Sequence, residues 1–295
     1  MVDAAEQPSS LGHWLADPAL IAVGERYYLY PTTDGHPGWG STSFSAFSSP
    51  DLVEWRDEGE VLRLGEDVRW AAREAWAPAV IERDGAFYCY FTAEQNIGVA
   101  RADAPTGPFK DLGRPLIAKG DYPGAAIDPS VFTDEDGVRY LYWGNGIAHG
   151  VPLGDDLMSF DPGKVVSWVP TGFREAVTVH RRHGRYYLSW SENDTREADY
   201  RVRYAVGTGP LGPWEDRGVL LEKRPERGIL GTGHHTILRV PGADDWIIAY
   251  HRFAIPDGDG FHREIMFDWL VHRADGDLEP VTPARTPIRA PIPPR

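Results

Sequence analysis

The chain has 295 residues, of which 42% are hydrophobic, and its formal net charge at pH 7 is −14. Its Lys and Arg residues are scattered, so it lacks the clustered basic surface that binds nucleic acid phosphates, and the negative balance also disfavours anionic membranes. No run approaches the roughly 18 consecutive apolar residues of a membrane span. We therefore expect an acidic, globular, monomeric protein.

The N-terminal segment MVDAAEQPSSLGHW has no basic stretch followed by an apolar one, which is the pattern of a secretory signal peptide. We expect a cytoplasmic protein, or a secreted one whose leader is absent from this sequence. The single cysteine, Cys89, excludes an internal disulfide and a cysteine-based zinc site. Its place within FYCYF indicates a buried strand.

One unit recurs along the chain, in which a polar turn containing glycine is followed by an aromatic strand. The copies in chain order are VGERYYLY (23–30), DGAFYCYF (84–91), DGVRYLYW (136–143), HGRYYLSW (183–190) and the weaker GADDWIIAYHR (242–252). An apolar strand precedes each turn, so every copy predicts a β-hairpin. A second phrase, typified by SPDLVEWRDEG (49–59) and GPLGPWEDRG (209–218), follows several hairpins and predicts the outer edge of each unit.

The spacing of these units predicts the fold class. The marker glycines of the five hairpins lie 61, 52, 47 and 58 residues apart, and each unit has room for about four short strands. This is the blade size of a β-propeller, and we predict an all-β, five-bladed β-propeller. The alternatives are a β-sandwich whose strands resemble one another by accident and a parallel β-helix, whose repeats are shorter.

A single domain accounts for the whole repeat. We expect the propeller to span residues 11–281 without a linker. The C-terminal tail, residues 282–295, contains five prolines and is expected either to run extended across a blade or to be disordered.

Counting back from the marker glycines gives the residue that begins the innermost strand of each blade. In a propeller these residues converge on the central axis. They are Asp17, Ala77, Asp128, Glu175 and His234. Three carboxylates and a histidine are thus expected to meet there, where charge is costly unless it has a function.

Opposed carboxyl groups on a concave, aromatic-rich face are what cleavage of a glycosidic bond requires. One acts as an acid on the departing oxygen, and the other acts as a base or nucleophile. The motifs of competing chemistries are missing, since there is no Gly-x-Ser-x-Gly elbow, no His-Glu-x-x-His zinc helix and no phosphate-binding glycine loop.

Five motifs in order resemble the family 43 glycoside hydrolases, which are inverting five-bladed β-propellers. They are ADP (16–18), WAP (76–78), IDPSVF (127–132), REA (174–176) and GTGHHT (231–236). The resemblance covers Trp14 to about Val281. It implies that Asp17 is the general base, Asp128 tunes pKa values and orients, and Glu175 is the general acid. One departure is that many relatives have glycine and proline where Ala176 and Val177 follow Glu175.

The resemblance also implies a cofactor and a substrate. His234 is expected to hold a hydrated calcium or similar ion in the central channel, and no organic cofactor is expected. The segments 173–195 and 231–252 are most similar to exo-acting α-L-arabinofuranosidases that trim arabinan. The implied partner is therefore a carbohydrate with terminal 1,5-linked α-L-arabinofuranosyl residues. The alternatives are a β-xylosidase, a β-D-galactofuranosidase and a non-catalytic carbohydrate-binding propeller.

A sugar site combines aromatic platforms with hydrogen-bonding groups. Aromatic side chains expected on loops entering the axial face are Trp14, Phe44, Trp76, Trp143 and Phe173. Arg252, at the end of the fifth aromatic strand, is expected either to pair with a catalytic carboxylate or to form a surface or blade-to-blade ion pair. His235 is expected to point into neighbouring packing.

Overall fold

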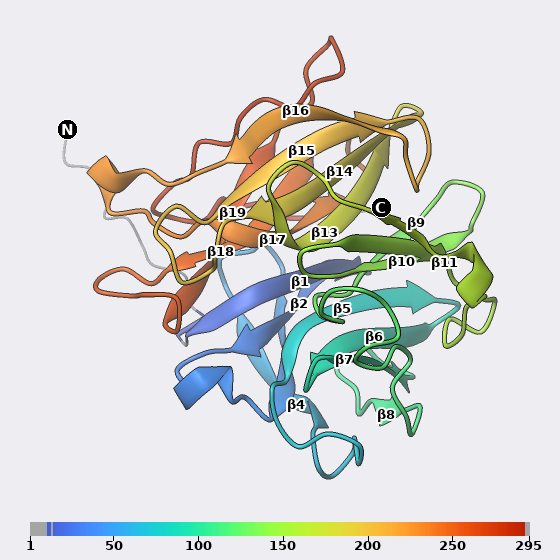
Figure 1. The fold of residues 1–295 in the computed structure, drawn as a ribbon. Coiled ribbons are helices and arrows are strands. Elements are labelled where there is room, and N and C mark those ends of the chain that lie inside the picture. The colour runs from blue at the N-terminus through green and yellow to red at the C-terminus, as the bar shows by residue number, and fades with distance from the viewer. Residues whose placement is uncertain (1–10, 13, 293–295) are drawn as a thin grey trace.

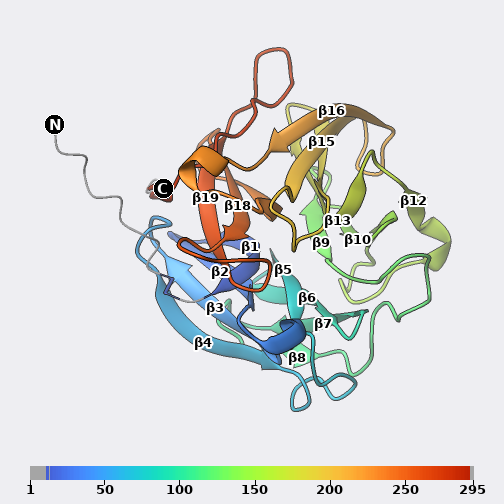
Figure 2. The same cartoon turned by 60° about the vertical axis from the view of Figure 1, so that its left-hand side comes forward.

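The structure of the protein, a computed structural model, describes residues 11, 12 and 14–292. Its nineteen strands form five antiparallel sheets arranged in a ring (Figures 1 and 2), which confirms the five-bladed β-propeller. The three helices of the described chain are single 3₁₀ turns at Pro37–Trp39, Pro162–Lys164 and Pro225–Arg227. No helix of this part of the chain is long and apolar enough to cross a membrane.

Each blade is one copy of the sequence repeat, with its strands following one another outward from the axis. Blade 1 comprises β1 (Leu15–Val23), β2 (Arg26–Thr33), β3 (Ser43–Ser49) and β4 (Arg56–Arg63). Blade 2 comprises β5 (Trp76–Arg83), β6 (Ala86–Ala93), β7 (Asn96–Ala102) and β8 (Lys110–Asp111). Blade 3 comprises β9 (Ser130–Thr133), β10 (Arg139–Trp143), β11 (Ala148–Pro152) and β12 (Val166–Trp168). Blade 4 comprises β13 (Phe173–Arg182), β14 (Arg185–Glu192), β15 (Arg201–Gly207) and β16 (Trp214–Leu221). Blade 5 has three strands, β17 (Gly233–Arg239), β18 (Trp246–Phe253) and β19 (Arg263–Leu270).

The marker glycines make the inner hairpins tight. In blade 2 the turn between β5 and β6 holds Asp84 and Gly85, both at positive φ, and Arg83 pairs with Ala86 across it. Positive φ at both central residues matches the right-handed twist of the flanking strands. The same arrangement recurs at His183 and Gly184 in blade 4.

Apolar side chains fill the space between neighbouring blades. The structure contains five buried hydrophobic clusters, and each joins one blade to the next, including blade 5 to blade 1. Cys89 lies in the cluster between blades 1 and 2, buried as expected. Because every blade is packed on both faces, the ring is closed and the inner strands are fixed around one axis.

The C-terminal segment lies against blades 5 and 1. The backbone N–H of Ile288 donates to the carbonyl of Phe267 on β19, and that of Ala290 donates to the carbonyl of Asp51 beyond β3. Ile288 and Ala290 also pack into the cluster between these two blades. This segment runs along β19, where blade 5 has no fourth strand.

Candidate active site

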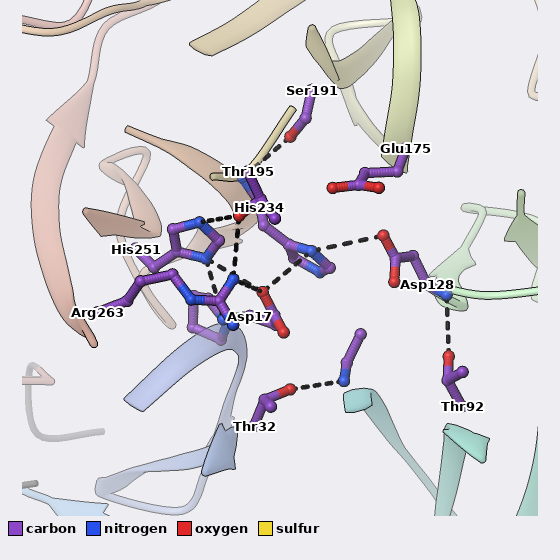
Figure 3. A network of polar contacts seen from close by, with 12 residues as sticks. Asp17, Thr32, Thr92, Asp128, Glu175, Ser191, Thr195, His234, His251 and Arg263 are labelled. Atoms are coloured by element: carbon purple, nitrogen blue, oxygen red, sulfur yellow. Dashed lines mark hydrogen bonds and ion pairs between the residues drawn. The ribbon is translucent and has the colours of Figure 1, made fainter. Parts of the chain in front are cut away.

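Each blade has one residue in the left-handed backbone conformation where its inner strand begins. These residues are Asp17, Ala77, Asp128, Ala176 and His234, with φ between 41° and 58°. In four blades the backbone N–H of this residue donates to a side chain on the second strand of the preceding blade. The acceptors are Nδ1 of His251, Oγ1 of Thr32, Oγ1 of Thr92 and Oγ of Ser191, at 2.7–3.3 Å (Figure 3). These bonds tie the blades together around the axis and fix the direction of the axial side chains.

Blade 4 departs from this pattern, and the departure corrects the register expected for Glu175. Its left-handed residue is Ala176, not Glu175, because pairing of β13 with β14 shifts on both sides of Glu175. The N–H of Ala176 is hydrogen-bonded to the carboxylate of Asp128. Glu175 therefore precedes the axial position by one residue, yet its side chain still lines the same pocket as Asp17 and Asp128.

Asp17 lies in a cationic environment that the sequence did not reveal. The guanidinium of Arg263 on β19 lies 3.3 Å from its Oδ1 and also donates to both carboxylate oxygens of Asp34, at 2.7 and 2.8 Å. Nδ1 of His251 lies 3.1 Å from the same Oδ1. Burial alone would raise the pKa of Asp17, but Arg263, His234 and His251 outweigh it and hold this pKa well below its usual range. Asp17 is therefore ionised at neutral pH.

His234 connects Asp17 to Asp128. Its Nδ1 lies 3.3 Å from Oδ1 of Asp17 and 3.6 Å from Oδ2 of Asp128 (Figure 3). Burial, together with Arg263, lowers the pKa of His234, so the ring is neutral at pH 7. For Asp128, burial and the nearby carboxylates of Glu175 and Asp17 raise the pKa well above its usual value.

The carboxylate of Glu175 is hydrogen-bonded to side chains inside the pocket and lies near an arginine at its rim. Tyr200 donates its hydroxyl to Oε1 at 3.0 Å, and the Asn145 amide donates to Oε2 at 2.7 Å. On the rim, Nε of the half-exposed Arg174 lies 3.7 Å from Oε2. Burial is the largest influence and raises the pKa of Glu175, although Tyr200 and Arg174 oppose it.

The three carboxyl groups thus differ in protonation. Asp17 is held ionised, whereas Glu175 and Asp128 are shifted toward their protonated forms. A pair of carboxyl groups whose environments push their pKa values apart is the usual arrangement of a base and an acid in one site. The pocket can therefore accept a proton at Asp17 and donate one from Glu175.

The pocket has a volume of about 220 Å³, below the roughly 300–1,000 Å³ of cavities that hold drug-sized ligands. Trp39 and Trp76 line it, and the Trp76 indole donates to the carbonyl of Trp39 at 2.6 Å. Trp39 also stacks on Phe261, from the loop between β18 and β19, at 4.5 Å. Gly260 of that loop packs against the backbone of Arg196 in blade 4. Loops of blades 1, 4 and 5 are therefore in contact on one side of the pocket.

Of the aromatic residues expected around a sugar, only Trp76 lines this pocket. Phe44 and Trp143 are 0% and 1% exposed and belong to the cores between blades, so the prediction that they enter the axial face was wrong. Phe173 is also buried in a core cluster. Trp14 is exposed but packs edge-on against His262 and lines a separate groove beside 254–256. Sequence alone did not show which face of each strand is inward.

Arg252 does not reach a catalytic carboxylate. It pairs with Glu264 at 2.7 Å and donates to the carbonyls of Ala284 and Arg285, away from the pocket. The inward side chain is its neighbour His251, because successive side chains of a strand point to opposite faces. Asp34 was equally hidden, since Asp34-Gly35 has the appearance of an ordinary turn.

The metal expected at His234 finds few ligands. Among residues 11, 12 and 14–292, no three His, Cys, Asp or Glu side chains come together in a way that could hold an ion. Nδ1 of His234 already faces two carboxylates, which leaves one imidazole nitrogen, whereas Ca²⁺ takes six to eight oxygen ligands. These side chains do not by themselves fit a calcium ion, and no step below depends on one. The role of His234 as a ligand stays a prediction, which metal analysis of protein purified with and without chelator checks.

His235 packs between blades 4 and 5, with Nε2 2.6 Å from the hydroxyl of Ser189. Burial lowers its pKa to about 3.

As the pH falls below about 6.5, the unfolded chain binds a proton that folded His235 does not, so the free energy of unfolding decreases at roughly 1.4 kcal/mol per pH unit. We expect His235→Gln, which keeps a polar group near Ser189, to reduce the stability lost between pH 7 and pH 5 by about 2 kcal/mol.

Urea unfolding of the variant and the wild type at both pH values measures this effect. Val169→Ala, at an exposed position, changes no ionisable group and is the control that should leave the pH dependence unchanged. An undiminished loss in His235→Gln would contradict the neutral state of this histidine.

Known proteins share both this sequence and this fold. The model of the glycosyl hydrolases family 43 matches residues 11–278. The chain is 32% identical to the beta-D-galactofuranosidase xynD of Aspergillus niger, over 91% of this chain and 82% of the relative. It is 30% identical to a xylosidase/arabinosidase of Bacteroides ovatus, over 90% and 94% of the two chains. The crystal structure of a thermostable family-43 glycoside hydrolase is 28% identical and superposes with a TM-score of 0.84 over 97% of this chain and 98% of that one.

Proposed function

Since the chain belongs to the glycosyl hydrolases family 43 and is a glycosidase, we propose that it is an inverting exo-enzyme that releases terminal α-L-arabinofuranosyl residues. Its preferred substrate is the 1,5-linked chain of arabinan or of arabino-oligosaccharides. The observation that carries the proposal is that one pocket of about 220 Å³ holds Asp17, whose pKa is lowered, and Glu175, whose pKa is raised.

The shape of the pocket supports exo action. Its volume suits one sugar ring better than several consecutive ones, and contacts among Trp39, Phe261, Gly260 and Arg196 close one side. The end of a chain fits such a pocket better than an internal stretch does. Trp76 and Trp39 offer apolar faces to the ring, and the carboxylates accept hydrogen bonds from its hydroxyls.

In the proposed reaction, Glu175 donates its proton to the glycosidic oxygen as the bond from this oxygen to the anomeric carbon breaks. A water molecule attacks the anomeric carbon from the opposite face and loses its proton to Asp17. Arg263 keeps Asp17 ionised before the reaction. The charge of Asp17 raises the pKa of Glu175, which helps Glu175 to keep its proton until it is needed. Asp128 accepts a hydrogen bond from the N–H of Ala176 and so positions the backbone beside Glu175.

The direction of water attack gives the stereochemical test. An inverting enzyme needs about 6.5–9.5 Å between its two carboxyl groups, whereas a retaining one needs about 5 Å. We expect proton NMR to show β-arabinofuranose as the first product from an α-arabinofuranoside. α-Arabinofuranose as the first product would exclude Asp17 as a base acting through water.

The sugar preference is tested with aryl glycosides. We expect the highest kcat/KM for the α-L-arabinofuranoside among the α-L-arabinofuranoside, the β-D-galactofuranoside and the β-D-xylopyranoside. A second candidate is β-D-galactofuranosidase activity. It is supported by the similarity of the chain to the Aspergillus niger enzyme of that name. The two furanosides share their ring configuration and differ in the exocyclic chain. A tenfold preference for the xylopyranoside would contradict the proposal.

Arg174 offers a pH test of the acid. Replacing it by Gln removes a cation 3.7 Å from Oε2 of Glu175, so the pKa of Glu175 should rise further. A general acid must be protonated, and the high-pH limb of kcat is therefore expected to move to higher pH in Arg174→Gln.

The matched control is Arg101→Gln, which removes an exposed cation paired with Asp103 in blade 2. Its pH profile should equal that of the wild type. A downward shift of the limb in Arg174→Gln would mean that Glu175 is not the acid.

A further inference from the structure

A second groove lies at the end of the sheets opposite the catalytic pocket. Strand β13 runs from the pocket at Glu175 to Arg182, and β17 runs from His234 to Arg239. At about 3.3 Å per residue, these strands place their far ends roughly 15–25 Å from the pocket. The groove there has a volume of about 360 Å³ and lies between blades 4 and 5.

Trp269 forms the apolar part of this groove. It lies near the end of β19, which is the outermost strand of blade 5 because this blade has only three strands (Figure 2). Its side chain is 42% exposed, and Val271, two residues on, is 47% exposed. Of the eleven tryptophans in the chain, only Trp14 and Trp269 are exposed to this degree. The groove therefore presents an aromatic surface to solvent.

Fixed polar groups surround this tryptophan. Arg182 binds Asp244 through two contacts, Nε to Oδ1 at 3.2 Å and Nη2 to Oδ2 at 2.5 Å. The exposed carboxylate of Asp245 lies beside this pair, and His272 lines the same groove. The ring of His272 packs against Trp246 and Tyr187, which fixes its orientation.

We propose that this groove is a second, non-catalytic carbohydrate-binding site, which holds a neutral stretch of glycan while the pocket hydrolyses a chain end. The apolar face of a sugar ring stacks on the Trp269 indole. Its hydroxyls donate to Asp244 and Asp245 and accept from Arg182. The carboxylates and the net charge of −14 disfavour an anionic polymer.

The size of the apolar surface favours a glycan over a protein. A stable protein interface buries about 800 Å² on each partner, with an apolar centre of several residues. Here the exposed apolar side chains lining the groove are Trp269 and Val271. The proposal rests on the glycosidase activity of the chain and not on its preference for arabinose.

Affinity electrophoresis tests the proposal directly. Native gels containing linear arabinan, arabinoxylan or xylan are run with Glu175→Gln protein, which does not digest the polymer. We expect at least one polymer to retard this protein. Adding Trp269→Ala should weaken binding by roughly tenfold, and Trp269→Tyr should restore most of it. Val169→Ala, another exposed apolar residue, is the matched control and should migrate as the parent protein does.

Kinetics with active protein separate binding from catalysis. Trp269→Ala should leave kcat/KM on a small aryl glycoside within twofold of wild type and lower it severalfold on the retarding polymer. The proposal fails if no polymer retards the parent protein or if Trp269→Ala is retarded equally. It also fails if wild-type protein is a dimer that Trp269→Ala dissociates. An error in the proposed sugar preference appears only in the aryl glycoside panel and leaves the retardation intact.

Discussion

Asp17→Asn and Glu175→Gln are each expected to lower kcat by at least roughly 10²- to 10⁴-fold, the usual contribution of one proton transfer. Both changes preserve side-chain size and remove the ionisable group. The two losses should differ in their dependence on the leaving group. Glu175→Gln should recover much of its rate with a dinitrophenyl glycoside, because this leaving group departs without protonation. Asp17→Asn should not recover, because its water is still not activated.

Steady-state kinetics with a series of aryl arabinofuranosides measures both effects. Asp84→Asn removes an exposed turn carboxylate far from the pocket and should keep full activity. Circular dichroism should show all three variants folded. Recovery of Asp17→Asn, and not of Glu175→Gln, with the better leaving group would exchange the two roles. A variant of either residue with near-normal turnover would end the assignment.

Arg263→Met is expected to cost about 3–5 kcal/mol in the free energy of unfolding, since it leaves buried carboxylates without their cation. Arg263 is almost completely buried, and its guanidinium contacts Asp34, Asp17 and the hydroxyl of Thr195. The same change should lower activity, because the pKa of Asp17 rises when Arg263 is removed and less of the base is ionised.

Urea unfolding at pH 7 measures the stability change. In the double variant Arg263→Met/Asp34→Asn, part of the lost stability should return, because one unpaired buried charge is gone. Arg56→Met is the control, since this side chain is exposed and its contact with Glu58 should contribute at most about 1 kcal/mol. A cost in Arg263→Met no greater than in the control would show that the buried pair does not stabilise the site.

The sequence predicted the blades and the polar axial residues because both depend on short-range patterns. The glycine turns and aromatic strands of 23–30 and 84–91 specify hairpins locally, and a regular repeat then closes into a ring. Asp17, Asp128 and His234 could be located by counting from those turns. The count was one residue off at Glu175, because the irregularity on both sides of it moves the left-handed position to Ala176.

Other features depend on contacts that the sequence does not display. Arg263 and Asp34 are 229 positions apart and meet only when blade 5 closes against blade 1. Of the two roles expected for Arg252, an ion pair is found, with Glu264, and the pairing with a catalytic carboxylate is not. The inward residue is one position earlier on β18, at His251, which the sequence did not show. Phe44 and Trp143 could not be told apart in sequence from aromatic residues of the pocket, because core packing and sugar binding both use aromatic side chains.

A crystal structure of the Glu175→Gln variant with an arabino-oligosaccharide tests the central claim most directly. We predict that the terminal sugar occupies the pocket with its anomeric carbon between residues 17 and 175. A water molecule should lie on the Asp17 side, and residue 175 should contact the glycosidic oxygen. A sugar bound with both side chains on the same face of the ring, or outside this pocket, would contradict the account.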